Sequence, residues 1–329
     1  MRFFKLTNYI NFINKYLKIT SYILKCYKEF LRIRKFNQII FIYNYDVEPF
    51  TIGDFIIFLQ IVDLCHIKKK KIFVIKSQLR EKSKKLSIKD FSHMKKNHQN
   101  LAWHILKRDI KISFINHEIL NKLLIQKNIF FYNLIKKGKS LTNFNEFFLL
   151  FFSKKRKINF IKKKFPYQKK IKTKLHNQKF ITLFARKLNR DHQRNTDPNQ
   201  LKKIVDLLTY KYPTIKIVII SDLEFYKKFS KKFTHFKNII FSKKYNTSFL
   251  NDCNLICDSA LIISFFVGGI NQIALMTKKP YIIFSQSNYL DYKFFNFPFW
   301  KNKNQIHINS SSINYFLDTL KKCNYKIIN

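Results

Sequence analysis

Glycine is nearly missing from this chain, which has 4 glycines among 329 residues. The usual share of about 7% would give roughly 23. The chain is instead rich in Lys, Asn, Ile, Phe and Tyr, whose codons are rich in A and T, so we interpret the shortage as genomic drift. Glycine permits positive φ angles and a close approach of backbone to ligand. The four positions that keep it, Gly53, Gly138, Gly268 and Gly269, are therefore the first places to look for tight turns or ligand contacts.

Acidic residues are also scarce, since Asp and Glu total 19 against 64 Lys and Arg, giving a formal net charge of +45. Drift toward lysine codons explains part of this excess but not the shortage of acids. The charge indicates an anionic binding partner, which is a nucleic acid, an acidic membrane surface or a phosphorylated substrate. With 46% hydrophobic residues the chain is a folded protein, and its length suggests about two domains.

Cysteines are few, odd in number and scattered, five in all, which excludes a disulfide framework and indicates a reducing, cytoplasmic compartment. Cys253 and Cys257 stand four residues apart with no second pair or histidine partner nearby. This spacing favours buried helix cysteines over a metal site. We expect no metal and no cofactor.

Apolar runs long enough to cross a bilayer, about 18–20 residues, are absent from the sequence. Residues 1–35 are interrupted by Asn and Lys too often for a signal peptide. Their apolar residues recur every three or four positions with lysines between them, which predicts an amphipathic helix or helix pair. Such a segment either lies in an anionic membrane interface or packs on its own domain. The expected location is the cytoplasm, with peripheral attachment to the inner face of the plasma membrane as an open alternative.

Apolar strands separated by helices fill both halves of the chain, which predicts an α/β fold with mostly parallel sheets buried on both faces. In the first half, "NQIIFIYN", "DFIIFLQIVDLCHI" and "KIFVIK" indicate a β-α-β unit. Residues 154–178 are basic without one acidic side chain, so we expect a solvated linker that cannot form a core. The predicted organisation is a helical segment (1–35), a first Rossmann-like domain (36–153), the linker (154–178) and a second Rossmann-like domain (179–329).

The glycine pair, Gly268 and Gly269, follows the predicted strand "LIISFF" and precedes the predicted helix "INQIALMTKK". Ligands of open parallel sheets bind beyond the carboxyl ends of the strands, where helix N-termini attract anions. Two glycines would let the backbone approach a phosphate. The alternative is a tight turn that only packs the helix on the sheet.

Three arginines, Arg186, Arg190 and Arg194, crowd the loop after the strand "KFITLFAR", ahead of a helix with Asp197 as N-cap and Pro198 in its first turn. Arginine binds phosphate in a bidentate manner. The loop is either a diphosphate clamp or a solvated basic loop.

A third turn, "EPFTIGDFIIFLQ", holds Gly53 and Asp54 ahead of the first-half helix. Asp54 suits a helix N-cap or a partner of the helix dipole. It also suits a general base that faces a cleft between the two domains. The two roles are compatible.

Three motifs in this order carry a resemblance. "TIGDFIIFLQIVDL" resembles the Gly-Asp turn of bacterial heptosyltransferase-like glycosyltransferases, which have the two-domain GT-B fold. "GINQIALMTKKPYIIF" is similar to their donor-site segment, with Gly269, Ala274 and Pro280 at the family's spacing. The loop at 186–194 resembles their phosphate-binding loop.

The resemblance implies that Asp54 is the catalytic base and that Gly268, Gly269 and Asn271 hold the donor diphosphate, with Gln272 beside them. Gln272 stands where the family has a histidine, and Val267 and Gly268 replace an acidic residue and a threonine, which implies a divergent subgroup or a different sugar.

The implied reaction is metal-independent transfer of a sugar from a nucleotide-diphosphate sugar to a lipopolysaccharide or other surface-glycan acceptor, with no nucleic-acid partner. Two alternatives stay open. The net charge favours a nucleic-acid-binding protein, although no nucleic-acid module is recognised in the sequence. The missing histidine favours a catalytically inactive GT-B relative at the membrane surface.

Overall fold

The computed structural model describes residues 38–44, 52–64, 69–75, 88–105, 111–116, 118–119, 122, 130–133, 164–176, 178–187, 195–264, 269–277, 279–285, 304–309 and 312–323. The amphipathic segment predicted over 1–35, Gly138 and the helix expected at "NFNEFFLLFF" lie outside these ranges. Within them, no helix combines the length and the apolarity that a bilayer crossing requires.

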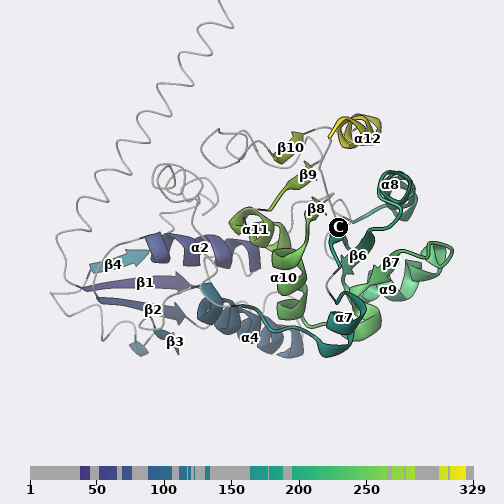
Figure 1. Ribbon diagram of the computed structural model, residues 1–329. Helices are drawn as coiled ribbons and strands as arrows, with labels where there is room; N and C mark the ends of the chain where they lie inside the picture. The colour runs from purple at the N-terminus through teal and green to yellow at the C-terminus, as the bar shows by residue number, and fades with distance from the viewer. Residues whose placement is uncertain are drawn as a thin grey trace, which may run out of the picture.

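The first sheet is parallel and has the order β3-β2-β1-β4 in the described residues (Figure 1). Phe41 at the middle of β1 pairs with Ile72 of β2 on one side and Tyr132 of β4 on the other. The sequence-predicted β-α-β unit is therefore confirmed. The elements of this unit are β1 (Gln38–Asn44), α2 (Ile52–Leu64), β2 (Lys69–Ile75), α4 (Ile88–Ile105), β3 (Lys111–Ile115) and β4 (Phe130–Asn133).

The second sheet is also parallel, with the order β10-β9-β8-β5-β6-β7 in the described residues. Counted from the first strand of this unit, that order is 3-2-1-4-5-6 read from the β7 edge, which is the doubly wound arrangement of dinucleotide-binding folds. Its strands are β5 (Phe180–Ala185), β6 (Lys216–Ser221), β7 (Ile239–Phe241), β8 (Leu261–Ser264), β9 (Tyr281–Ser285) and β10 (Gln305–Asn309). Its helices are α8 (Pro198–Lys211), α9 (Leu223–Phe229), α10 (Phe249–Asp258), α11 (Gly269–Met276) and α12 (Ile313–Lys322), with 3-10 turns η2 (Ser230–Phe233) and η3 (Ser242–Tyr245).

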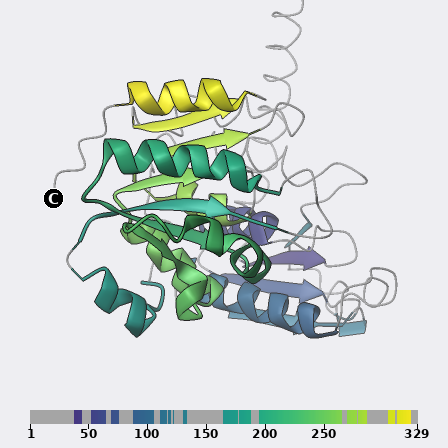
Figure 2. The same cartoon turned by 90° about the vertical axis from the view of Figure 1, so that its right-hand side faces the viewer.

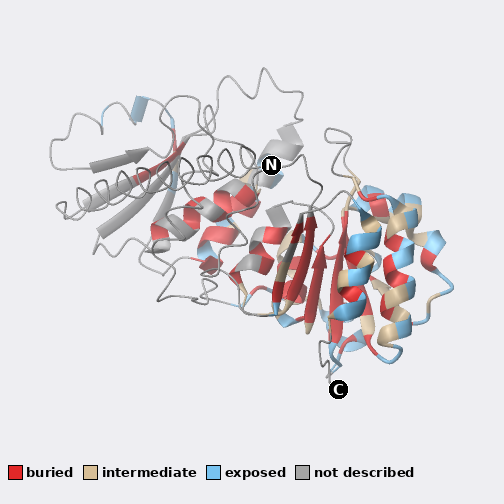
Figure 3. Ribbon diagram, turned by 90° about the horizontal axis from the view of Figure 1, so that it is seen from above, coloured by how far each residue is buried: buried red, intermediate tan, exposed pale blue. Residues whose placement is uncertain are grey.

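The strands of the second sheet are buried on both faces, as their continuous apolar sequences predict (Figure 3). Alternate residues of β5 belong to different cores: Ile181 and Leu183 join one, Phe180 and Phe184 the other. Figure 2 shows α8 and α12 running alongside the second sheet, and their apolar residues share one core with Ile181. The face of Ile181 is completed by the apolar residues of these helices, Leu201, Ile204, Val205, Leu208, Phe316 and Leu320.

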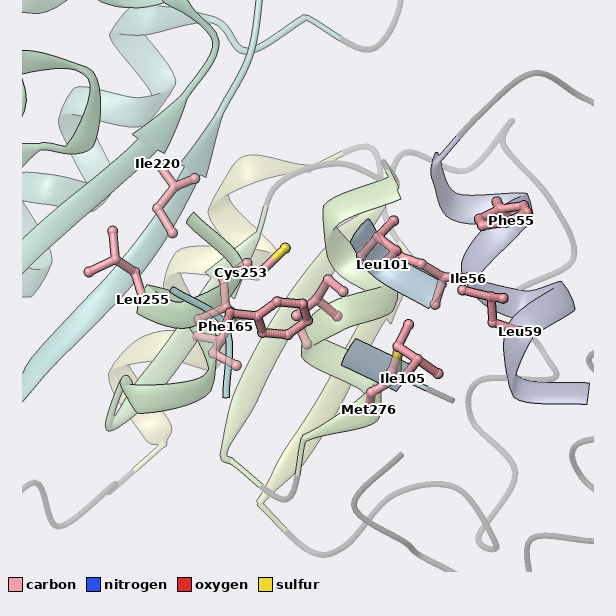
Figure 4. Packing of buried hydrophobic residues seen from close by; sticks show 14 of the residues in the cluster. Phe55, Ile56, Leu59, Leu101, Ile105, Phe165, Ile220, Cys253, Leu255 and Met276 are labelled. Carbon is pink, nitrogen blue, oxygen red and sulfur yellow. The ribbon is translucent and has the colours of Figure 1, made fainter. Parts of the chain in front are cut away.

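The opposite face of the second sheet shares one hydrophobic core with the first unit. Helices α2 and α4 from the first unit meet α10 and α11 from the second in this core (Figure 4). Its labelled members are Phe55, Ile56, Leu59, Leu101, Ile105, Phe165, Ile220, Cys253, Leu255 and Met276. The predicted arrangement of two facing Rossmann-like units, GT-B-like in its organisation, is confirmed. The exact bounds of the domains stay a prediction.

The basic segment is not the solvated connector that its charge predicted. Residues 164–176 place Phe165, Ile171 and Leu175 in the shared core, each at most 4% exposed. Ile171 and Leu175 lie four residues apart, on the buried side of α7 (Lys169–Lys174) and at its end. The Nδ2 group of Asn251 donates to the carbonyl of Pro166 at 3.0 Å and ties the segment to α10. The prediction was wrong here because long lysine side chains reach solvent from a helix that buries its few apolar residues.

Cys253 and Cys257 both lie on α10, the first buried and the second partly buried, and both are free thiols. Burial raises the pKa of Cys257 to about 12, helped by the nearby carboxylate of Asp258. The prediction of inward-facing helix cysteines is confirmed.

A buried ion pair joins η3 to α10. The Nζ group of Lys243 lies 2.6 Å from the Oδ2 atom of Asp252, and the two side chains are 14% and 5% exposed. The Oγ1 group of Thr247 donates to the other carboxylate oxygen at 2.7 Å. Lys243 also donates to the carbonyl of Thr247 at 2.7 Å. Asn246, between them, has a left-handed backbone (φ 54°) that turns the chain back toward α10.

Burial raises the pKa of the Asp252 carboxyl, an effect that the Lys243 ammonium and the Thr247 hydroxyl oppose. Removing one partner of such a pair leaves an uncompensated buried charge. Lys243→Met should therefore lower the free energy of unfolding by about 3 kcal/mol, measured by denaturant titration. Lys244→Met, at the exposed neighbouring position, should change it by no more than about 0.5 kcal/mol. Equal effects of the two variants would show that the pair does not stabilise the fold.

Candidate functional site

The strand order of the second sheet reverses between β5 and β8, which lie side by side although β6 and β7 come between them in sequence. In open parallel sheets the crevice for ligands lies at the carboxyl ends of the strands at such a reversal. Phe184 pairs with Ser264 at the ends of these strands. The Arg186 loop and the Gly268–Gly269 loop therefore leave the sheet next to each other.

The loop after β5 is closed at its base by two hydrogen bonds. The amide N–H of Arg186 donates to the Oγ1 atom of Thr196 at 2.9 Å, and the amide N–H of Thr196 donates to the carbonyl of Arg186 at 2.9 Å. These bonds hold Arg186, which is partly buried, at the mouth of the loop. Arg190 and Arg194 lie between the closed ends and outside the described residues.

The carboxylate of Asp222, at the end of β6, fixes the same loop from the neighbouring strand. Its Oδ2 atom accepts from the amide N–H of Lys187 at 2.6 Å, and its Oδ1 atom accepts from the amide N–H of Phe225 at 2.7 Å, which caps α9. Asp197 caps α8 through the amide N–H of Asn199, and Pro198 begins that helix, as predicted. The amide groups at the start of α8 thus follow directly on the arginine loop.

A short hydrogen bond joins β8 to α11. The Oγ group of Ser264, the last residue of β8, donates to the Oδ1 atom of Asn271 at 2.6 Å, and both residues are buried. The bond ties the end of β8 directly to the first turn of α11, the helix that Gly269 begins. Sequence reasoning missed Ser264, although a serine at the end of the otherwise apolar strand "LIIS" was the available signal.

The residues predicted to hold the donor gather around this turn. Gly269 is the first residue of α11 and Asn271 is buried in its first turn, at 2% exposure. Gly268 and the side chain of Gln272 lie outside what the structure describes. The side-chain oxygen of Asn271 accepts the hydrogen bond from Ser264. The carboxamide therefore helps to hold the first turn of α11 against β8.

Gly53 and Asp54 lie in the first turn of α2, in the first unit. Gly53 is buried. Asp54 is the third residue of α2, which begins at Ile52, a position that favours interaction of a carboxylate with the helix dipole. Its side chain lies outside the described residues, so its role as a base stays a prediction.

Aromatic rings immobilise this turn of α2. The ring of Phe55 stacks on that of His98 from α4, with centroids 4.1 Å apart and planes 9° apart. Tyr43 at the end of β1 contacts Phe55 and Phe58 edge-on, with centroids 5.1 Å away in both cases. Sequence reasoning missed His98, because a lone histidine on a polar-looking helix gives no signal of burial.

The two glycine-bearing helices meet in space. Helices α2 and α11, which come from different units, pack against each other (Figure 1). Gly53 and Asp54 therefore belong to a helix that touches the helix of Gly269 and Asn271. The structure places Arg186, Gly269 and Asn271 at the carboxyl edge of the second sheet, and α2 packs against the helix that carries the last two. A cleft between the two units stays a prediction.

This arrangement suits an anionic group. Helix N-termini point unsatisfied amide N–H groups and the positive end of the helix dipole at their surroundings. One such terminus, that of α11, follows β8 at the strand reversal, and Arg186 lies directly after the neighbouring strand β5. The start of α8 differs, because Pro198 has no N–H and the amide N–H of Asn199 donates to Asp197. Backbone amide groups and arginine are the donors that phosphate groups prefer, and the diphosphate site stays a prediction.

No family model and no curated protein sequence matches this chain. Among solved structures, a glycosyl transferase family 9 protein from Veillonella parvula is 10% identical with a TM-score of 0.44, covering 88% of this chain and 92% of its own. E. coli ADP-heptose lps heptosyltransferase II is 9% identical with a TM-score of 0.45, covering 86% and 97%. A putative UDP-N-acetylglucosamine 2-epimerase from Listeria monocytogenes is 9% identical with a TM-score of 0.46, covering 87% of each chain. Likenesses this distant support no statement about substrate or reaction, which must come from the chain's own residues.

The Ser264–Asn271 bond can be measured with a double-mutant cycle. Ser264→Ala, Asn271→Ala and the double variant should give a coupling energy of about 1 kcal/mol, the usual net value of one hydrogen bond. Ser221→Ala is the matched control, because Ser221 ends the nearby strand β6 and its buried Oγ atom has no hydrogen-bond partner among the described residues. That variant should be neutral or slightly stabilising. A coupling energy near zero would mean that the bond does not fix the glycine turn.

Proposed function

We propose that this chain is a glycosyltransferase that takes a sugar from a nucleotide-diphosphate sugar and passes it to a hydroxyl group of an acceptor. The acceptor proposed from the motif resemblance is a lipopolysaccharide or another surface glycan. The donor would bind the second unit and the acceptor would approach from the first.

The observation that carries this proposal is the strand order of the second sheet. It sets the Arg186 loop beside the loop of Gly269 at the reversal point, although some eighty residues separate them in the sequence. Both loops also carry the sequence features that suit phosphate binding, arginines in one and adjacent glycines in the other. A phosphate-binding function explains why a glycine-poor chain keeps two adjacent glycines at this place.

The proposed chemistry is a displacement at the anomeric carbon. The acceptor oxygen forms a bond to that carbon while the bond between the carbon and the diphosphate oxygen breaks. Asp54 takes the proton of the acceptor hydroxyl as general base. The negative charge that develops on the departing diphosphate is stabilised by the arginine loop and by the amide groups at the start of α11.

Metal-independence is part of the proposal, since fixed amide dipoles and arginines can supply the stabilisation that a divalent cation gives elsewhere. The arrangement of α2 against α11 supports a role for Asp54, because it brings the helix of the base to the helix of the donor site. A catalytically inactive relative would keep the binding function and lose turnover. An active transferase and an inactive relative therefore differ in turnover but not in donor binding.

Donor binding is expected to depend on the glycine turn. In a panel of nucleotide sugars, at least one should raise the thermal midpoint, since a ligand at 100 times its dissociation constant stabilises by about 2.7 kcal/mol. Gly269→Val should abolish that shift, because a β-branched side chain would occupy the space of the phosphates. Thr173→Val on α7, an exposed position, should keep it. A panel without any shift, or a shift that survives Gly269→Val, contradicts the proposal.

Turnover is expected to depend on Asp54. Asp54→Asn should keep the fold and the ligand-induced thermal shift, while release of nucleoside diphosphate in the presence of acceptor falls by about 10²–10⁴. Asp318→Asn, at an exposed position of α12, should leave the rate unchanged. If Asp54→Asn retains full activity, or unfolds the protein, Asp54 is a structural residue of the helix start. If the parent binds a donor but never transfers it to any glycan acceptor, the protein is an inactive relative.

A further inference from the structure

An exposed tryptophan stands beside a surface of lysines on the described part of the chain. Trp103, near the end of α4, is 60% exposed. Its ring contacts that of His104, with centroids 4.7 Å apart, and His104 contacts Phe165, with centroids 4.6 Å apart. Trp103 is thereby placed next to the segment that leads into α7.

The lysines of this surface come from α4 and from residues 164–174. All of them are exposed: Lys96, Lys164, Lys169, Lys170, Lys172 and Lys174. We call these six lysines together with Trp103 the α4–α7 surface. Figures 1 and 2, two views at right angles, both show α4 and α7 along the lower side of the molecule.

The α4–α7 surface carries far more basic than acidic side chains. Helix α4 contains one acidic residue, Asp90, near its start, and residues 164–176 contain no Asp and no Glu. The carboxylate of Asp258 on α10 acts electrostatically on Tyr167 of this segment. The remaining excess of ammonium groups raises the electrostatic potential and attracts an anionic partner.

The tryptophan decides between anionic partners. Trp is enriched where proteins meet the membrane–water interface, because its large apolar ring and its polar N–H suit the headgroup region. Lysines around it would face the anionic headgroups, and their alkyl stems can lie along the apolar boundary. A nucleic acid would use the lysines equally well but would leave one tryptophan ring, set among lysines rather than on a stacking platform, without a clear role.

We propose that the α4–α7 surface docks this protein on an anionic lipid bilayer, with Trp103 inserted at the headgroup level. The protein stays at the membrane surface, and attraction between the lysines and the anionic headgroups supplies most of the binding free energy. It is independent of the transferase reaction, so it can hold or fail whatever the outcome of the activity measurements.

The experiment uses the full chain and vesicles of phosphatidylcholine with 30% phosphatidylglycerol, compared with phosphatidylcholine alone. Each lysine near an anionic surface contributes about fivefold to the partition coefficient, which is the equivalent of about 1 kcal/mol. Replacing Lys169, Lys172 and Lys174 by glutamine should therefore lower partitioning onto the anionic vesicles by roughly 100-fold. The matched control replaces three exposed lysines of α8 and α12, Lys202, Lys203 and Lys322, by glutamine; it carries the same charge change and should bind within a few-fold of the parent.

Insertion of Trp103 gives a second, spectroscopic readout. The chain has two tryptophans, so Trp300→Phe leaves Trp103 as the only one. Its emission should shift to shorter wavelength with anionic vesicles and stay unchanged with neutral ones. Equal losses for the α7 triple variant and its control, or an emission maximum that does not move, would overturn the proposal. Loss of RNA binding in the α7 variant with unchanged vesicle binding would do the same, and would assign the surface to nucleic acid.

Discussion

The structure depends on one hydrophobic core that both sheets share. Helices α2 and α4 fill it from the first unit, and α10, α11 and one face of the second sheet fill it from the other side. Each large apolar side chain buried there contributes about 1.5–3 kcal/mol relative to exposure. Because this core belongs to both units, it fixes α2 against α11 and thereby sets the first glycine turn in relation to the second.

The hydrogen bonds of Ser264, Thr196 and Asp222 at the candidate site hold the backbone in place; none of them orients a side chain toward a ligand. Ser264 closes the turn before α11 through Asn271, Thr196 closes the arginine loop on Arg186, and Asp222 clamps the next amide of that loop. A site built from amide groups needs such rigidity, since its ligand is held by the positions of N–H groups. The phosphate contacts proposed for Gly268 and Gly269 would depend on such rigidity.

Much of the fold could be predicted from the sequence, because parallel strands buried on both faces leave continuous apolar runs such as those of β5, β6 and β8. Elements with polar or lysine-rich sequences escaped prediction: α7 buries one apolar residue, Ile171, among four lysines, and β10 is the short strand "QIHIN". The basic segment was misinterpreted for the same reason.

At the site, the sequence identified the loops but not what holds them. Asp197 was recognisable as a cap because it acts on its own helix. Ser264, Thr196 and His98 act on partners that only the folded chain brings near, so composition and spacing could not reveal them.

The central claim is that a nucleoside diphosphate binds where β5 and β8 end. Hydrogen exchange measured by mass spectrometry, with and without the nucleotide sugar that gives the largest thermal shift, tests it directly. The account predicts slower amide exchange in the peptides that cover residues 185–197 and 264–272, since amides that bind phosphate are protected from exchange. Unchanged exchange in both peptides, with protection confined to other parts of the chain, would contradict it.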